Sequence, residues 1–154
     1  MYNNDDSVIF LEKKAKEKGL CLKERVRITR EETLSVLKGD YSFMADSDKE
    51  LLKEFYYKVR IQGLRPKTIV EYTREAFTYP AGNVRVTLDY NIRTGLNSTD
   101  FLNPECILLP AGAVNPVLEV KWDEFLPNII RDVVQLTGRR TTAFSKYAVC
   151  RIYG

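Results

Sequence analysis

Charged residues occupy alternate positions in several short segments that otherwise read as β-strands. Glu12 and Lys14 are separated by one residue, as are Glu119 and Lys121. Side chains alternate between the two faces of a strand, so each pair lies on one face, and a residue such as Val120 lies on the other. Such a polar face is either solvated surface, where one ion pair contributes about 0–1 kcal/mol, or the wall of a cavity for a multiply charged ligand.

The cavity interpretation points to phosphate chemistry. Like charges on neighbouring strands repel, and a polyanion together with a divalent cation would offset that repulsion. Arginine offers a planar fork for phosphate oxygens and lysine a compact point charge. The basic residues that could converge, if the sheet curls into a barrel, are Lys14, Lys23, Arg25, Arg74, Arg85 and Lys121. Glu119, with Glu12 as a second carboxylate, could hold a metal that bridges two phosphates. Phosphoryl transfer relies on positioning and charge neutralisation, so a site without a nucleophile–histidine pair is chemically sufficient.

Composition narrows the chemistry further. The chain has no histidine, which removes the commonest metal ligand and general base and favours Mg²⁺ or Mn²⁺ over zinc. Its net charge of +3, from 24 basic and 21 acidic residues, is too balanced to indicate a nucleic-acid partner. Three widely spaced cysteines predict reduced thiols and a cytoplasmic location. We expect no membrane segment in this chain, and a membrane partner protein stays open.

The pattern of apolar residues and turn residues predicts an α+β domain of mainly antiparallel strands. The expected strands are residues 8–17, 20–28, 67–77, 83–92, 114–122 and 143–153. Thr29 and Ser47 each stand three residues before a glutamate, which is typical of a capping box. They predict helices that end near Lys38 and at Gly63. A third helix is expected to begin at Pro127, a turn is expected at 80–83 and a loop at 93–112, while Trp122 and Phe125 are expected to be core residues or a helix staple.

A set of short motifs, taken in chain order, resembles the VTC domain. This is the polyphosphate polymerase domain of the vacuolar transporter chaperone complex and its bacterial relatives. The motifs are Tyr72–Phe77, Val84–Asp89, Val117–Lys121, Leu126–Pro127 and Phe144–Tyr147, with looser matches at Phe10–Lys14 and at Lys23 and Arg25. The resemblance implies the triphosphate-tunnel fold of the CYTH-like superfamily, an antiparallel β-barrel whose basic interior holds polyphosphate. It also implies an enzyme that transfers the terminal phosphate of ATP to a growing polyphosphate chain with Mn²⁺ or Mg²⁺.

The resemblance also assigns roles to individual residues. Those implied to contact phosphates are Tyr72, Arg74, Arg85, Ser145 and Lys146, and we expect Arg74, Arg85 and Lys146 to serve the transfer. Those that would add to the basic wall are Lys14, Lys23 and Arg25. Glu119 would be the metal ligand and Lys121 its neighbour.

The chain departs from the family pattern at its start. It begins directly before the strand that carries Glu12 and Lys14, whereas the family's domain opens with two further strands that bear basic residues. We therefore expect residues 1–154 to form a single VTC-like domain that lacks its N-terminal strands, with a barrel that is incomplete or open.

Three functions are compatible with this sequence, and polyphosphate synthesis is the one that we expect. The same tunnel could instead hydrolyse tripolyphosphate or nucleoside triphosphates, or it could bind polyphosphate without catalysis. Nucleic-acid binding is not expected, because it would need an open basic face with exposed stacking aromatics.

Overall fold

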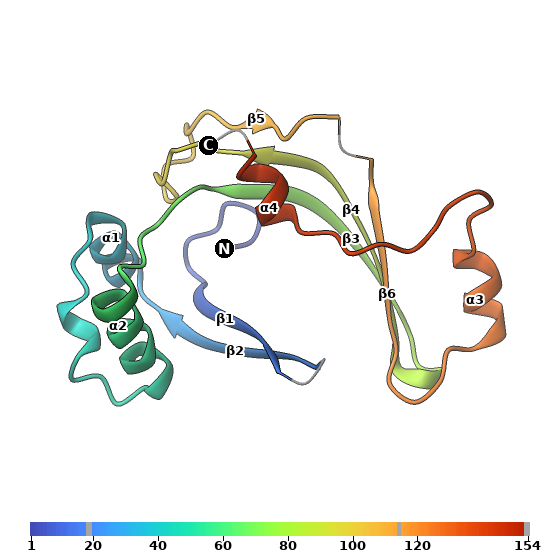
Figure 1. Cartoon of the computed structure of the whole chain (residues 1–154), viewed down its shortest axis with the longest axis horizontal. Helices are drawn as coiled ribbons and strands as arrows, with labels where there is room; N and C mark the ends of the chain where they lie inside the picture. Colours follow the sequence, from blue (N-terminus) through green and yellow to red (C-terminus); the bar gives the residue numbers. More distant parts are fainter. Residues whose placement is uncertain (18–19, 114, 153–154) are drawn as a thin grey trace. The chain divides into compact units, whose positions relative to one another are not determined.

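The computed structural model describes residues 1–17, 20–113 and 115–152. The chain divides into two compact units. The first comprises Met1–Lys67 and Thr99–Cys106, and the second comprises Thr68–Ser98 and Ile107–Gly154. Each unit has its own sheet, which is drawn in Figure 1. Among the described residues, no helix is long and apolar enough to cross a membrane.

The first unit is built on an antiparallel hairpin. Strand β1 (Ile9–Glu17) pairs with β2 (Leu20–Ile28), in a register that sets Ile9 opposite Ile28. Both predicted strands are therefore confirmed. Helix α1 (Arg30–Lys38) follows directly, a short 3₁₀ turn η1 covers Ser42–Met44, and α2 (Glu50–Gln62) completes the unit. Ile9, Ile28 and apolar residues of the helical segments form its core, so one face of the hairpin end is covered by helix.

The two predicted capping boxes have different outcomes. At α1 the Thr29 side chain accepts a hydrogen bond from the Glu32 backbone and the Glu32 side chain binds the Thr29 backbone, so this capping box is confirmed. The second is wrong. Helix α2 begins at Glu50, after Lys49, and Ser47 instead accepts a hydrogen bond from the Lys49 backbone amide at 3.2 Å. A serine hydroxyl used in a local turn is not available to cap a helix that begins three residues later.

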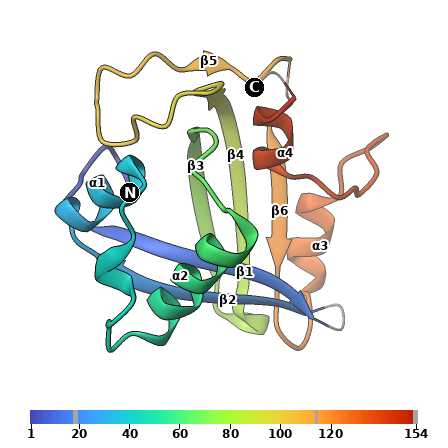
Figure 2. The same cartoon turned by 60° about the vertical axis from the view of Figure 1, so that its left-hand side comes forward.

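The second unit has a four-stranded sheet centred on one long strand. Strand β4 (Val84–Thr94) pairs on one side with β3 (Val70–Tyr79), and on the other with β5 (Leu109–Pro110) and β6 (Val117–Lys121). All four run antiparallel to their neighbours. Figure 2 shows β3, β4 and β6 side by side. The predicted hairpin is confirmed, and its turn lies at Pro80–Asn83, where η2 (Ala81–Asn83) reverses the chain.

The β3–β4 ladder contains one irregularity. The register shifts between Glu71 and Thr73, whose partners are Arg93 and Tyr90. Strand β4 therefore has two residues, Asn91 and Ile92, where β3 has only one. The extra residue forms a β-bulge in β4. Asn91 within it has a φ of 52°, which lies in the left-handed region that asparagine tolerates better than most residues.

Two short helices complete the second unit. Helix α3 (Asn128–Val134) begins after Pro127 as expected. Helix α4 (Lys146–Cys150) replaces the strand predicted over 143–153, a prediction that is wrong for the described residues; residues 114 and 153 of the predicted strands lie outside them. The cause is local capping combined with burial. The Ser145 hydroxyl accepts the Ala148 amide at 3.2 Å, and Cys150 is fully buried against the sheet.

The apolar residues near α3 are not in a core. Trp122 is 49% exposed and Phe125 53% exposed, so the expectation that they would be core residues is wrong, and their alternative role as a helix staple stays a prediction. The small core of this unit is instead Ile92, Ala111 and Cys150. The described residues contain four α-helices rather than three, and no sheet among them closes into a barrel. The α+β class and the antiparallel pairing are confirmed, whereas barrel closure stays a prediction.

Candidate functional site

One face of the second sheet carries polar side chains from three neighbouring strands, and it is called the polar face here. Because residues paired in an antiparallel ladder lie on the same face, the alternation predicted along each strand extends across the sheet. The face carries Arg74, Ala76 and Thr78 on β3, Arg85, Thr87 and Asp89 on β4, and Val117, Glu119 and Lys121 on β6. The face that the spacing of Glu119 and Lys121 predicted within β6 is thus continuous with the face of β4 that carries Arg85, Thr87 and Asp89.

Asp89 is the centre of this polar face. Its side chain is 1% exposed, yet it is charged and has two cationic partners. Arg74 donates through Nε to Oδ1 at 2.6 Å and through Nη2 to Oδ2 at 2.7 Å. Lys146 places Nζ 2.6 Å from Oδ2. This three-residue set, called the Asp89 cluster below, joins side chains from β3, β4 and α4.

Local structure accounts for the meeting of these three residues. The turn at Pro80–Asn83 sets the hairpin register, in which Arg74 lies directly opposite Asp89. Lys146 is the first residue of α4, and that helix is fixed to the sheet at its other end. There Thr94 donates through Oγ1 to the Cys150 carbonyl at 3.1 Å. Hydrogen bonds to a buried carboxylate are charge-assisted and directional, so the cluster has a defined geometry.

The electrostatics of the cluster favour full ionisation. Burial alone raises the pKa of the Asp89 carboxyl, but the hydrogen bonds from Arg74 and Lys146 outweigh burial and leave that pKa below its ordinary value. The hydrogen bonds to Asp89 likewise raise the pKa of Arg74, with a smaller contribution from the charge of Glu119. The cluster therefore carries two positive charges and one negative charge at neutral pH.

The ring of Tyr72 contacts both cations. Its centroid lies 5.3 Å from Cζ of Arg74 and 4.7 Å from Nζ of Lys146, distances at which a cation–π attraction operates. The structure thus brings together Tyr72, Arg74 and Lys146, which the sequence analysis expected to contact phosphate. Ser145 lies beside them in the chain, but its hydroxyl caps α4.

Glu119 and Lys121 form the outer part of the polar face. Their side chains are 3.4 Å apart and well exposed. Arg85 lies opposite Lys121 and Thr87 opposite Glu119 in the β4–β6 ladder. Thr87 is buried, and its Oγ1 has no hydrogen-bond partner among the described residues. The two adjacent cations and the adjacent carboxylate are available to a ligand that approaches this face.

The remaining predicted residues belong to the first unit. Glu12 and Arg25 are partners in the β1–β2 ladder, as are Lys14 and Lys23. Lys23 binds Glu12 at 2.7 Å, and the Arg25 guanidinium lies 4.9 Å from the centroid of the ring of Phe10. The four charged residues share one face of the hairpin, as their spacing predicted. Their convergence with the residues of the second unit stays a prediction.

The carboxylates in the described part of the chain do not make an all-protein metal cage. Among the described residues there is no group of three or more His, Cys, Asp or Glu side chains that could hold a metal ion. Asp89 is already occupied by two cations, which leaves Glu119 as the accessible carboxylate of the polar face. One carboxylate is sufficient for Mg²⁺ when substrate phosphates supply further ligands. Glu119 therefore fits a metal that is held mainly by phosphate oxygens.

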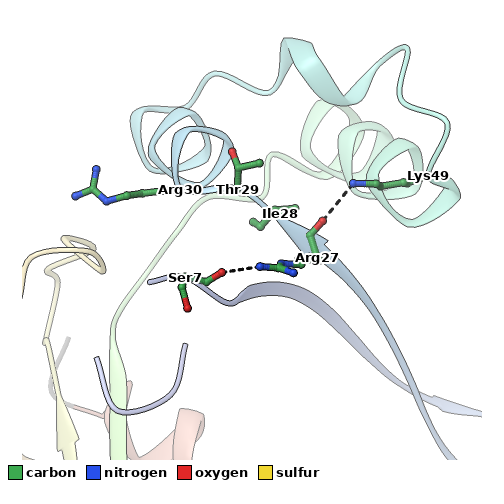
Figure 3. Close-up of a pocket in the computed structure, with 6 residues that line it drawn as sticks. All are labelled: Ser7, Arg27, Ile28, Thr29, Arg30 and Lys49. Carbon is green, nitrogen blue, oxygen red and sulfur yellow. Dashed lines mark hydrogen bonds between the residues drawn. The ribbon is translucent and has the colours of Figure 1, made fainter. Parts of the chain in front are cut away.

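The first unit also contains a pocket that the sequence analysis did not predict. It has a volume of about 380 Å³, is lined by Ser7, Arg27, Ile28, Thr29, Arg30 and Lys49, and is drawn in Figure 3. Arg27 donates to the Ser7 carbonyl at 2.8 Å and Lys49 to the Arg27 carbonyl at 3.3 Å, as the dashed lines show. Arg30 binds Asp6 at 2.7 Å. The three basic side chains of this pocket, those of Arg27, Arg30 and Lys49, are thus each bound to another group of the chain.

A second pocket, of about 420 Å³, lies at the bulge of the β3–β4 ladder. Its lining residues are Glu71, Thr73, Asn91, Ile92, Arg93 and Pro110. Glu71 and Arg93 form an ion pair across it at 3.2 Å. Neither pocket contains a residue of the Asp89 cluster, and the charged side chains that line the pockets are bound to groups of the chain itself. The polar face is therefore the candidate site.

Asp89 lies within a motif that the sequence analysis matched, Val84–Asp89, but it was given no role in the site. The signal was present in the hairpin, because counting outward from the turn at Pro80–Asn83 pairs Arg74 with Asp89. Lys146 could not be joined to this pair without knowledge of where α4 lies.

The fold and site define an α+β protein whose antiparallel sheet presents arginine, lysine and carboxylate side chains on one face. The model of the VTC domain family matches residues 1–152, so this chain belongs to the VTC domain family. A comparison with curated proteins gives no match. The family predicted from the short motifs is confirmed.

Proposed function

We propose that this chain is a polyphosphate polymerase domain that transfers the terminal phosphate of ATP to a growing polyphosphate chain. The observation that carries the proposal is the Asp89 cluster, in a chain that belongs to the VTC domain family. It offers two oriented cations, beside a tyrosine ring and next to an accessible carboxylate. That set of groups suits the binding and charge neutralisation of a phosphate chain.

The cluster retains donors for a ligand. A guanidinium has five N–H donors and an ammonium three. Arg74 directs two nitrogens to Asp89, so the N–H groups not used there can bind phosphate oxygens. Lys146 forms one contact with Asp89, which leaves two donors. Both side chains keep some exposure, 33% for Arg74 and 22% for Lys146, whereas Asp89 is inaccessible.

The proposed reaction needs no general base. A terminal oxygen of the acceptor chain, already anionic, attacks the γ-phosphorus of ATP and forms a new P–O bond. The bond from that phosphorus to the β,γ-bridging oxygen breaks, and ADP leaves with the electron pair. Arg74, Arg85 and Lys146 would hold and neutralise the phosphoryl group in flight, which is the main contribution of the protein in phosphoryl transfer.

A divalent cation, Mg²⁺ or Mn²⁺, would supply further neutralisation of the phosphates. Glu119 would hold it, with Lys121 beside it, and Glu12 is proposed as a further metal-binding carboxylate. We further propose that Lys14, Lys23 and Arg25 on the β1–β2 hairpin bind phosphate. We also propose a cytoplasmic location, where ATP is available; the Cys150 thiol is not in a disulfide, as expected in a reducing compartment.

The test is incubation of the protein with ATP and Mn²⁺, followed by gel analysis of the products stained for polyphosphate. A ladder of chains supports the polymerase. Free phosphate without chains would replace it with a hydrolase, and binding of tripolyphosphate without turnover would replace it with a binding module.

Glu119→Gln tests the metal role separately. We expect metal-dependent turnover to be lost while tripolyphosphate affinity, measured without metal, stays within about twofold, because the phosphate-binding cations remain. The matched control is Glu124→Gln, which removes the same charge from an exposed residue after β6. Unchanged turnover in Glu119→Gln would exclude Glu119 as the metal ligand.

A further inference from the structure

We propose that Asp89 is a positioning residue, which orients Arg74 and Lys146 toward the substrate phosphate without touching it. The inference rests on the proposed function, because it adds a residue to the same site. Asp89 cannot bind the substrate itself, since its side chain is 1% exposed and carries the same sign of charge as phosphate.

The contacts of Asp89 define how it acts. Both of its oxygens accept from Arg74, and one of them also accepts from Lys146. Arg74 belongs to β3 and Lys146 to α4, so one carboxylate sets the spacing between cations that come from different elements. A long cationic side chain that is free in solution samples many rotamers, and fixing it before the ligand arrives lowers the entropy lost on binding.

Tyr72 restricts the two cations from another direction. Its ring lies within 5.3 Å of the Arg74 guanidinium carbon and within 4.7 Å of the Lys146 ammonium nitrogen. Each cation is therefore held by a buried carboxylate and by an aromatic ring, and its unused donors point away from Asp89. This is the arrangement expected of a preorganised anion site.

The charge of Asp89 makes the proposal sharply testable. If the carboxylate served only as a negative charge near the site, its removal would strengthen the binding of a polyanion, because the local charge rises by one. If it positions the two cations, its removal weakens binding although the site becomes more positive. The two roles predict opposite signs for the same substitution.

The experiment compares Asp89→Asn with Glu75→Gln in calorimetric titrations with tripolyphosphate. The first substitution keeps the size of the side chain and removes its charge. The second removes the same charge from the opposite face of the sheet, where Glu75 accepts a hydrogen bond from the Tyr90 hydroxyl. We expect Asp89→Asn to weaken binding about tenfold or more, since hydrogen bonds to charged groups are worth roughly that factor each. Glu75→Gln should change it by less than about twofold.

Asp89→Glu serves as the second variant, and it stands in for Asp89→Asn if that variant does not fold. It restores the charge but moves the carboxylate by one methylene, so we expect affinity to fall several-fold. In turnover assays of the folded variants, kcat should fall more than KM rises, because the cations must be aligned in the transition state. Affinity of Asp89→Asn, or of Asp89→Glu, equal to or above that of the wild type would overturn the proposal.

One further measurement separates this inference from the proposed function. Wild-type protein that does not bind tripolyphosphate would refute the function itself. In that case, hydrogen exchange of the α4 backbone amides still tests whether the ion pair between Asp89 and Lys146 holds α4 on the sheet, a contact called the tether here. We expect faster exchange in Asp89→Asn and wild-type exchange in Glu75→Gln, and equal rates in both variants would overturn the tether.

Discussion

Replacement of Thr87 by valine should make this protein more stable. Thr87 lies in the middle of β4 on the polar face, between the positions of Arg85 and Asp89. It is 2% exposed, and its hydroxyl has no hydrogen-bond partner among the described residues. Valine has nearly the same shape, is equally suited to a strand and has no polar group to desolvate.

The magnitude follows from the buried hydroxyl. A buried polar group without a partner costs about 1–3 kcal/mol in proteins. Valine removes that cost and adds one buried methyl group in place of the hydroxyl, while the larger methyl group must be accommodated beside the ladder partners Ala76 and Glu119, which limits the gain. We expect the free energy of unfolding to rise by about 1–2 kcal/mol. For a chain of this size that corresponds to a Tm increase of roughly 2–8 °C.

Urea unfolding followed by circular dichroism measures the change, with a check that the m-value is the same in both proteins. Thr73→Val is the matched control, because Thr73 is exposed on the other face of the same hairpin and its replacement should alter stability by less than about 0.5 kcal/mol. A Thr87→Val protein that is less stable than the wild type, with an unchanged control, would show that the hydroxyl has a partner and that the reasoning is wrong.

Three further predictions concern the turn, the buried acid and the buried thiol. Gly82→Ala should destabilise the protein by about 1–3 kcal/mol more than Gly138→Ala in urea unfolding. Both glycines have a φ of 73°, but of the two only Gly82 would place a new Cβ in a steric clash with the Phe125 carbonyl oxygen. Equal losses of stability in the two variants would contradict the clash. The folded state lowers the pKa of Asp89, so its contribution to stability is present above the unfolded value of about 3.9 and is lost as pH falls through the folded value. The stability difference between wild type and Asp89→Asn should therefore shrink below about pH 4, and a constant difference would count against the ion pairs. Burial raises the pKa of the Cys150 thiol, so iodoacetamide at pH 8 should modify it only after unfolding, as peptide mass spectrometry would detect; rapid modification of the folded protein would show that the thiol is accessible.

The hairpins were predictable because their signals are local. Alternating apolar residues and the turn residues at Pro80–Asn83 specify β3 and β4 without reference to the rest of the chain. The capping box at Thr29 succeeded for the same reason. The same spacing at Ser47 failed, since a serine can bond to a backbone amide two residues later as readily as it can cap a helix.

Helix α4 could not be predicted from its own residues. Five residues are too few for a helical period to be read, and an isolated helix of that length is not stable in water. It exists because Cys150 is buried and Lys146 reaches Asp89, which are contacts with strands far away in the sequence. The sequence analysis therefore named Tyr72, Arg74 and Lys146, which lie together in the structure, whereas the carboxylate that joins the two cations and the helix that carries Lys146 came only from the structure.

The predicted convergence of the two groups of basic residues does not follow from local sequence patterns. Lys14, Lys23 and Arg25 were assigned to the site by family resemblance, and the local pattern of β1 and β2 specifies only that they share a face. Local patterns fix faces and registers, whereas long-range packing fixes which faces meet.

The bulge at Asn91 changes which side chains of β4 can act together. In a regular strand Asp89 and Thr94, five positions apart, would point in opposite directions. The extra residue reverses the alternation, so both side chains reach α4: Asp89 through Lys146 and Thr94 through the Cys150 carbonyl. Strand β4 therefore has two segments with opposite side-chain alternation: the segment with Asp89 contributes to the polar face, and the segment with Thr94 anchors α4. Deletion of Asn91 would be more damaging than any substitution there, because α4 could then be held at only one of its ends.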